Sequence, residues 1–212
     1  MSKAIFPCEF ENKLKLDFFS GSGSGYFVDV GANEPQNGSQ TWPLEQLGWT
    51  GVLIEPQQDL ADRLRRERRA KVYAVACSSP GNSGKSARLN LAGIHTSLDP
   101  GFFVFGMRRN GTSSAPLRTL DEILIDAKAP VPLDFVSIDV EGHEIETLEG
   151  FTLHRWRPRL ILIEDIVLNL RIHRYLMRRG YKWVRRTGIN GWYVPLDSPM
   201  TISFQGGVAI LP

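Results

Sequence analysis

A chain of 212 residues with 42% hydrophobic and 23% charged residues has the size and composition of one soluble α/β domain with a substantial core. The net charge of +2 gives no general attraction to nucleic acid or to an anionic membrane surface, and no window reaches the roughly 18 apolar residues that a spanning helix needs. The two cysteines, Cys8 and Cys77, lack metal-ligand spacing and suit a reduced, cytoplasmic compartment, and the N-terminus lacks the apolar run of a signal peptide.

The first half of the chain alternates apolar segments with helical periodicity. Residues 20–25 read Ser-Gly-Ser-Gly-Ser-Gly and predict a flexible lead-in rather than a phosphate loop, because they precede the first strand. The pattern then predicts strands over 26–30, 52–54 and 71–76, with helices over 39–47 and 57–69. Residues 77–118 break this pattern and are rich in Gly, Ser and Asn, so no elements are assigned to them.

Regular alternation resumes at Thr119, which has Glu122 three residues later and so predicts a capping box for a helix over 119–127. The remaining pattern predicts strands over 135–140 and 160–163, helices over 143–148 and 169–179, and a final antiparallel pair near 181–185 and 192–194. This alternation favours a single domain, 1–212, with a doubly wound α/β fold. We expect a mostly parallel, seven-stranded Rossmann-like sheet with an antiparallel C-terminal strand.

A glycine turn after the first strand and an acid after the second predict a site for a nucleoside-bearing cofactor. Gly31 ends the first strand, and Glu55 lies where an acid accepts hydrogen bonds from ribose hydroxyls. Asn33 and Gln36 occupy the positions of the second and third glycines of a dinucleotide site. S-adenosylmethionine carries no phosphate and needs only one close glycine, so the sequence predicts a methyl-donor site.

Four further residues are candidates for cofactor contact. Asp29 can orient the turn or bind the amino group of the cofactor, and Ser39 can cap the next helix or bind its carboxylate. Ala76 and Cys77 follow the third strand, at the edge expected for an adenine ring, where Ser78 also lies. The structural alternative is that the polar groups of this region only bond turn amides and cap helices.

Acidic residues follow two later apolar strands. Asp139 directly follows the apolar segment Phe135-Val-Ser-Ile138. Glu164 and Asp165 directly follow the apolar segment Leu160-Ile-Leu-Ile163. If these strands are neighbours, their ends lie about 5 Å apart, and the carboxylates repel unless a proton or a cation intervenes. Hard oxygen ligands suit Mg²⁺, so Asp139, Glu164 and Asp165 are candidate ligands. The alternative is that Glu164 or Asp165 bonds loop amides and no cation binds.

His143 lies among these acids and is the candidate general base, because an imidazole titrates near neutral pH. A metal ion that lowers the pKa of a bound hydroxyl would assist the same proton removal. Asp139 and Glu141 are the accompanying catalytic candidates. The alternative for His143 is a residue at a helix N-terminus bonded to the backbone. Candidates for substrate contact are Glu144, Trp192 and Tyr193, of which the two aromatic residues are core residues in the alternative interpretation.

Several strings resemble the FkbM-type methyltransferases in content and order across roughly residues 26–194. The strings are Phe27-Val-Asp-Val-Gly-Ala-Asn33, Ser39-Gln-Thr41, Gly48-Trp-Thr-Gly-Val-Leu-Ile-Glu-Pro56, Arg118-Thr-Leu-Asp121, Ile138-Asp-Val-Glu-Gly-His-Glu144, Leu148-Glu-Gly150 and Leu162-Ile-Glu164. The string over 138–144 is the most specific. A departure is Glu34-Pro35, where the family often has Asp-Gly or a similar pair.

The resemblance implies the class I S-adenosylmethionine fold and methylation of hydroxyl oxygens on sugars or natural products. It places Asp29, Gly31, Asn33 and Glu55 at the cofactor, and it places Asp139, Glu141 and His143 near the acceptor. The acids that end the two later strands are also similar to metal positions of catechol and macrocin O-methyltransferases.

We therefore expect a cytoplasmic, S-adenosylmethionine-dependent O-methyltransferase that acts on a small-molecule or oligosaccharide acceptor with Mg²⁺ assistance, and whose acceptor site is shaped by 77–118. No nucleic-acid or membrane partner is expected. Arginine-rich faces over 63–69 and 171–179 are solvated, or they contact an anionic partner or a second copy in a homodimer. The alternatives are a metal-free methyltransferase of a non-sugar product, a nicotinamide oxidoreductase, and a non-catalytic binding module.

Overall fold

The computed structural model of the chain describes residues 9–93, 95–101, 110–165 and 170–199, and its centre is a seven-stranded sheet of order β3-β2-β1-β7-β8-β10-β9. Every neighbouring pair is parallel except those of β10, which is antiparallel to both β8 and β9. This confirms the predicted doubly wound sheet with an antiparallel C-terminal strand. The strands are β1 (Tyr26–Val30), β2 (Thr50–Ile54), β3 (Lys71–Tyr73), β7 (Phe135–Ile138), β8 (Leu160–Glu164), β9 (Tyr181–Thr187) and β10 (Asn190–Pro195).

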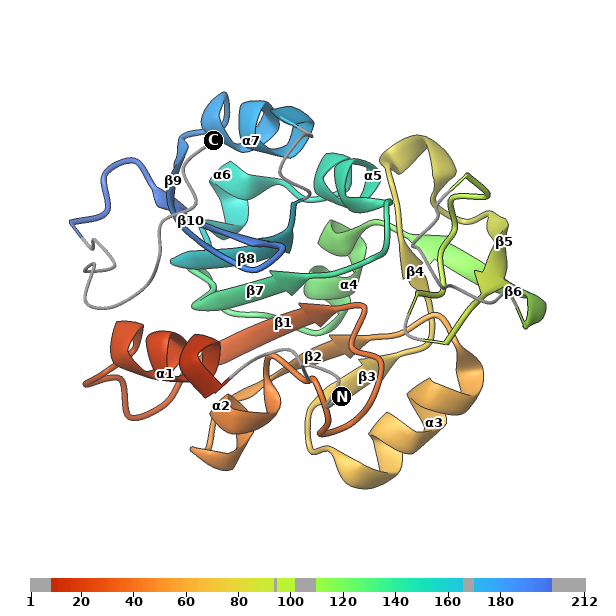
Figure 1. Cartoon of the computed structure of the whole chain (residues 1–212), viewed down its shortest axis with the longest axis horizontal. Helices are drawn as coiled ribbons and strands as arrows, with labels where there is room; N and C mark the ends of the chain where they lie inside the picture. Colours follow the sequence, from red (N-terminus) through yellow and green to blue (C-terminus); the bar gives the residue numbers. More distant parts are fainter. Residues whose placement is uncertain (1–8, 94, 102–109, 166–169, 200–212) are drawn as a thin grey trace.

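Helices cover both faces of this sheet because its buried strands direct apolar side chains alternately to the two sides (Figure 1). Val28 and Ile138 face a core shared with α4, α5, α6 and α7, whereas Phe27 and Leu162 face a core shared with α1, α2 and α3. The helices are α1 (Glu9–Phe18), α2 (Trp42–Gln46), α3 (Gln58–Glu67), α4 (Leu120–Asp126), α5 (Glu144–Glu149), α6 (Leu153–Trp156) and α7 (Leu170–Met177).

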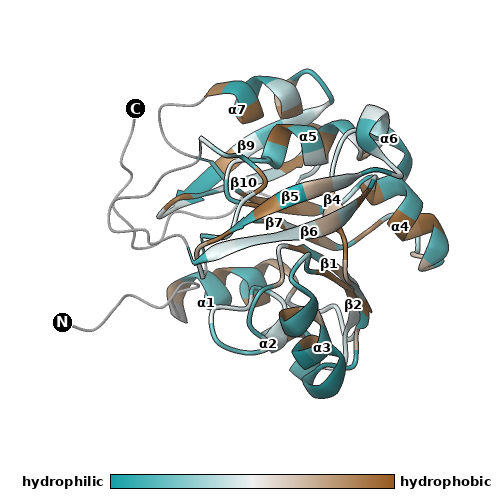
Figure 2. Cartoon of the chain, turned by 90° about the vertical axis from the view of Figure 1, so that its right-hand side faces the viewer, coloured by the Kyte–Doolittle hydropathy of each residue, from teal (hydrophilic) through white to brown (hydrophobic). Residues whose placement is uncertain are grey.

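A second, three-stranded sheet of order β4-β6-β5 arises mainly from the segment without predicted elements. It comprises β4 (Ala76–Cys77), β5 (Ser86–Leu91) and β6 (Gly111–Arg118), with the short 3₁₀ helix η1 (Pro80–Asn82) after β4. Figures 1 and 2 both show this small sheet beside the carboxyl ends of the main strands. In Figure 2 β6 is pale along most of its length, which explains why hydrophobic periodicity gives no signal there.

The N-terminal helix α1 is a second element that the pattern did not predict. Its Lys15 side chain is buried and donates to the backbone oxygen of Gln40 at 2.7 Å, and the Gln40 amide donates to Glu11 at 2.9 Å. Polar contacts therefore fix this helix against the loop after β1. Within the described ranges, no helix has the length and apolar character needed to cross a bilayer. Assignment of 1–212 to one domain stays a prediction.

The start of α4 has the predicted capping box, and it allows a direct test of helix stability. Thr119 Oγ1 accepts from the Glu122 amide at 3.1 Å, and Glu122 Oε2 accepts from the Thr119 amide at 2.8 Å. We expect Thr119→Ala to lower the free energy of unfolding by about 1 kcal/mol, measured by urea denaturation. Glu122→Gln keeps an acceptor at that position and should have a smaller effect. Equal losses in the two variants would contradict this explanation.

Candidate functional site

Four residues of interest directly follow residues that are paired across four neighbouring parallel strands. In the register, Ile54 pairs with Val30, Val30 with Ile138, and Ile138 with Ile163. The next residues along the four strands are therefore neighbours at the carboxyl edge, and they are Glu55, Gly31, Asp139 and Glu164. The strand order reverses between β1 and β7, which is where ligands bind in open α/β sheets.

A narrow hollow, here called the first hollow, lies between this edge and the small sheet. Predicted cofactor contacts that line it are Gly31, Asn33, Glu55, Ala76 and Cys77. Apolar walls come from β2, β5 and the adjoining loops, and they are formed by Ile54, Val75, Leu89 and Leu98. Asp139, Glu141 and His143 also line it. The structure thus brings eight predicted site residues to one place.

The turn after β1 is shaped by its neighbours in the protein. Gly31 has φ +85°, and a Cβ atom there would lie 1.8 Å from the backbone oxygen of Asp139. Asn33 is also left-handed, with φ 50°, and its amide donates to Glu55 Oε2 at 2.9 Å. The amide of Gln57 donates to the other Glu55 oxygen at 2.8 Å. Close packing against Asp139 therefore requires the glycine, and Glu55 holds the turn as well as facing the hollow.

The charge of Glu55 is easily lost because the carboxyl group is buried. Burial raises its pKa to about 7, and the two backbone amides only partly oppose this. A carboxylate has about four lone-pair directions, of which the two amides occupy two. Glu55 can therefore accept further hydrogen bonds from a ligand in the first hollow.

Asp29 and Ser39 do not line this hollow but belong to a buried polar network on the other face of β1. Thr41 Oγ1 donates to Asp29 Oδ2 at 2.6 Å. Ser39 Oγ accepts from the Trp42 amide at 3.1 Å and from Arg68 at 3.2 Å. Burial raises the pKa of Asp29, opposed by the Thr41 hydroxyl and the Arg68 charge. Asp29 and Ser39 hold the loop that follows β1, and their contact with the cofactor stays a prediction.

Three carboxylates meet at the ends of β7 and β8. Asp139, Glu141 and Glu164 each have one carboxylate oxygen that lies within 4.8 Å of the corresponding oxygens of the other two. Asp139 keeps access to solvent and Glu164 is partly buried. Loss of hydration raises the pKa of both carboxyl groups. The charge of Asp139 is the second cause that raises the pKa of Glu164. Burial and then Asp139 raise the pKa of Glu141 to about 8. This acidic cluster contains two of the three predicted metal ligands.

The third predicted ligand, Asp165, lies outside the acidic cluster. Successive residues of a strand point to opposite faces, so Glu164 and Asp165 diverge. Asp165 Oδ2 is instead 3.1 Å from the Tyr193 hydroxyl and 3.2 Å from Arg186. Glu141 is the third member of the acidic cluster instead. Its own backbone is left-handed, with φ 54°, and this turns the chain back toward Asp139. The prediction of Asp165 as a ligand is therefore wrong for this conformation.

The predicted contacts of Trp192 and Tyr193 with a substrate are also wrong. Both side chains are 0% exposed, because β10 lies inside the sheet between β8 and β9. Trp192 Nε1 donates to Thr187 at 2.6 Å, and the Tyr193 hydroxyl contacts Asp165. These are core aromatic residues with satisfied polar tips, so neither ring can stack on a ligand without rearrangement.

A second hollow adjoins the first, and His143 lines both. Its other walls come from the loop before β6, α5, the end of β8 and α7, and their charged residues are Asp99, Glu144, Glu146, Glu164 and Arg171. Glu144 accepts from the Gly142 amide at 3.0 Å, and burial raises its pKa to about 7. The predicted substrate contact Glu144 thus faces the second hollow.

His143 stands at the beginning of α5 with both ring nitrogens near oxygen atoms. Nε2 is 3.1 Å from Ser78 Oγ, and Nδ1 is 3.8 Å from Glu146 Oε2. Burial lowers its pKa below the ordinary value of 6.5, although Glu146 and Asp99 oppose this. Burial therefore favours the neutral imidazole, which is the form that can accept a proton.

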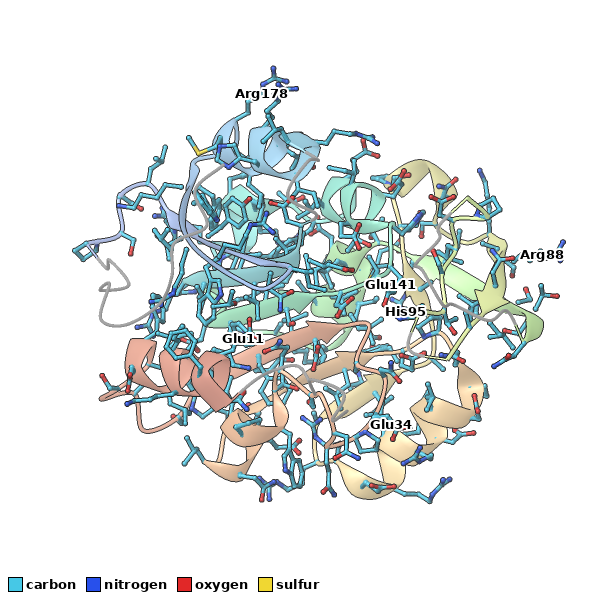
Figure 3. All side chains as sticks on the ribbon, viewed as in Figure 1. Glu11, Glu34, Arg88, His95, Glu141 and Arg178 are labelled. Atoms are coloured by element: carbon cyan, nitrogen blue, oxygen red, sulfur yellow. The ribbon has the colours of Figure 1, made fainter. Side chains whose placement is uncertain are left out.

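His95 is a site residue that the sequence analysis missed. Its Nδ1 is 3.1 Å from Glu141 Oε1, and the Ser97 hydroxyl donates to the backbone oxygen of Glu141 at 2.5 Å. Figure 3 labels His95 and Glu141 next to each other beside the small sheet. The loop that follows β5 therefore fixes one member of the acidic cluster. A lone histidine in a segment without periodicity carries no signal for this contact.

Comparisons with known proteins bear on the family of the chain. The profile of the family described as "Methyltransferase FkbM domain" matches residues 29–183, which is more than half of the chain. No curated protein matches. Among solved structures, the chain is similar to a methyltransferase from Geobacter sulfurreducens, with 14% identity, a TM-score of 0.47, and coverage of 91% of this chain and 80% of that one. This second similarity is too weak to bear on the site.

Proposed function

Because the chain belongs to the FkbM methyltransferase family, we propose that this methyltransferase moves a methyl group from S-adenosylmethionine to a hydroxyl group of a sugar or oligosaccharide. The observation that carries the proposal is that the two hollows meet at His143. A donor in the first hollow and an acceptor in the second would face each other across this imidazole. Such an arrangement supplies proximity and a base at the same point.

The first hollow suits the cofactor by its chemistry. Bound S-adenosylmethionine would supply an electrophilic methyl group on a sulfonium. Ile54, Val75 and Leu89 offer apolar contact for an adenine ring, and Glu55 retains lone pairs for ribose hydroxyls. Asn33 and Gln36 stand where a pyrophosphate site needs glycine, which argues against a nicotinamide dinucleotide.

The second hollow favours a neutral acceptor with several hydroxyl groups. Asp99, Glu144 and Glu146 offer carboxylate acceptors for hydroxyl donors, whereas an anionic acceptor would meet like charges there. The hydroxyl that reacts would give its proton to His143 as its oxygen receives the methyl group. The oxygen–carbon bond would form as the sulfur–carbon bond of the donor breaks.

The acidic cluster would hold Mg²⁺ through Asp139, Glu141 and Glu164, in support of the same reaction. Three carboxylate oxygens at mutual distances up to 4.8 Å suit a hard divalent cation. A bound cation would supply Lewis-acid activation of a hydroxyl group. A metal-free methyltransferase is the second candidate, because the hydrogen bond between Asp139 and Glu164 lets one proton take the place of the cation.

Cofactor identity is tested by calorimetry with S-adenosylhomocysteine and NAD. We expect binding of S-adenosylhomocysteine and no binding of NAD. Glu55→Gln should weaken the binding at least about tenfold, because its new NH₂ group would face a backbone N–H that Glu55 now satisfies.

Glu34→Gln is the matched control for this experiment. Glu34 pairs with the half-exposed Arg63 of α3 and is not among the residues that line the first hollow. Its affinity for S-adenosylhomocysteine should equal that of the unmodified protein. Binding of NAD in place of S-adenosylhomocysteine would reject the proposed function.

A further inference from the structure

Ser78 is a fully buried serine that directly contacts the proposed base and lines neither hollow. It directly follows β4 of the small sheet, and its amide donates to the Arg118 carbonyl at 3.0 Å. Its own carbonyl packs so closely on α5 that a Cβ atom at Gly150 would lie 2.3 Å away. The backbone of Ser78 is therefore held from two sides, which fixes its hydroxyl oxygen relative to His143.

The contact between Ser78 Oγ and His143 can run in either direction, depending on the tautomer of the imidazole. Asn82 Nδ2 donates to this oxygen at 3.2 Å, and His143 Nε2 lies 3.1 Å from it. A serine oxygen can accept two hydrogen bonds, so it can accept from both groups; when Nε2 carries no proton, the hydroxyl donates to the ring instead. Nδ1, the other ring nitrogen, is the one near Glu146 in the second hollow. A base that acts in the second hollow must then carry its proton on Nε2 and keep Nδ1 bare.

We propose that Ser78 is a positioning residue for the reaction, which accepts the Nε2 proton of His143 and so leaves Nδ1 free to take the proton of the acceptor hydroxyl. This inference rests on the proposed function and adds the tautomer and the nitrogen that reacts. The imidazolium formed by proton transfer keeps its Nε2–H bond to Ser78, so charge develops next to a preorganised oxygen. The small sheet thereby contributes to the chemistry through a residue that touches no substrate.

Kinetics of two variants test the proposal. Ser78→Ala removes the acceptor, and Ser78→Cys keeps the size of the side chain but offers a weak sulfur acceptor. Both should lower kcat about tenfold, while KM for the acceptor and affinity for S-adenosylhomocysteine change less than twofold. Ser83→Ala is the control, because Ser83 lies on the same loop but donates to the exposed Glu122. Unchanged kcat in both Ser78 variants, or loss of cofactor affinity together with kcat, would overturn the proposal.

A spectroscopic measurement on the unmodified protein reads the tautomer directly, and a variant is needed only to assign the signal. Nitrogen-15 NMR of labelled histidine distinguishes a protonated Nε2 from a protonated Nδ1, and the missing signal in His143→Ala assigns the resonance among the four histidines. We expect protonated Nε2; protonated Nδ1 would overturn the proposal. The proposed function fails separately, if S-adenosylhomocysteine does not bind or if His143→Ala retains full turnover.

Discussion

Replacement of His143 by alanine is expected to lower kcat by about a hundredfold or more and to leave the affinity for S-adenosylhomocysteine unchanged. The ring lines the first hollow but is none of the apolar residues proposed to contact the cofactor there, so its loss removes a base and leaves those surfaces in place. Burial lowers the pKa of His143, so the neutral form is present above that pKa. Activity that depends on this base should fall as the pH decreases through it.

The measurement compares kcat and calorimetric affinity in His143→Ala and in His154→Ala. His154 is exposed on α6 and lines neither hollow, so its replacement controls for the loss of an imidazole. Turnover of His143→Ala within threefold of the unmodified enzyme would remove the residue from the mechanism. Loss of cofactor affinity in that variant would show that His143 supports the first hollow instead.

The main sheet was predictable because its strands are short apolar runs that are followed by turn-forming or acidic residues. Strand ends also locate the edge of the sheet, so Glu55, Asp139 and Glu164 could be placed together before the register was known. Helix α1 was missed for the opposite reason. Its Glu11 and Lys15 are charged but buried, and their partners lie far away in the chain, so sequence periodicity reads them as surface residues.

Errors at the site have the same physical origin. Choosing between Glu164 and Asp165 requires the face of β8 that meets Asp139, which only the register reveals. Glu141 joins the acidic cluster through a left-handed backbone conformation that an ordinary residue rarely adopts. His95 reaches the site through the loop after β5, where the sequence has no hydrophobic pattern. Ser78 follows β4 at the edge expected for an adenine ring, but its contact with His143 could not be read from the sequence. These contacts depend on tertiary structure rather than on local sequence.

Chelation of divalent cations is expected to abolish methyl transfer, and added Mg²⁺ is expected to raise the melting temperature at pH 8 much more than at pH 5.5. The reason is competition between protons and the cation for the acidic cluster. Burial and neighbouring charge raise the pKa of Glu141 to about 8, and they also raise the pKa values of Asp139 and Glu164. At pH 5.5 protons therefore occupy the cluster, whereas at pH 8 a cation can replace them.

Without a cation, the same pKa shifts give stability a definite dependence on pH. Glu141 and Glu144 have raised pKa values of about 8 and about 7, against an ordinary value of 4.5. Between pH 4.5 and 8 the folded chain retains protons that the unfolded chain has released. Because the folded state binds more protons in this window, stability decreases as the pH rises through it. Bound Mg²⁺ should offset this loss, since it replaces the missing protons.

Two variants test whether a bound cation or a shared proton allows the carboxyl groups of the acidic cluster to lie close together. Glu164→Gln removes one charge and one ligand, so it should raise the stability of the cation-free protein at pH 8 and remove the response to Mg²⁺. Glu149→Gln changes an exposed acid at the end of α5 and should alter neither. Full activity in EDTA together with no Mg²⁺-dependent change in melting temperature at pH 8 would reject the metal. The shared proton between Asp139 and Glu164 would then explain how three carboxyl groups remain together, and His143 would act as the base without a cation.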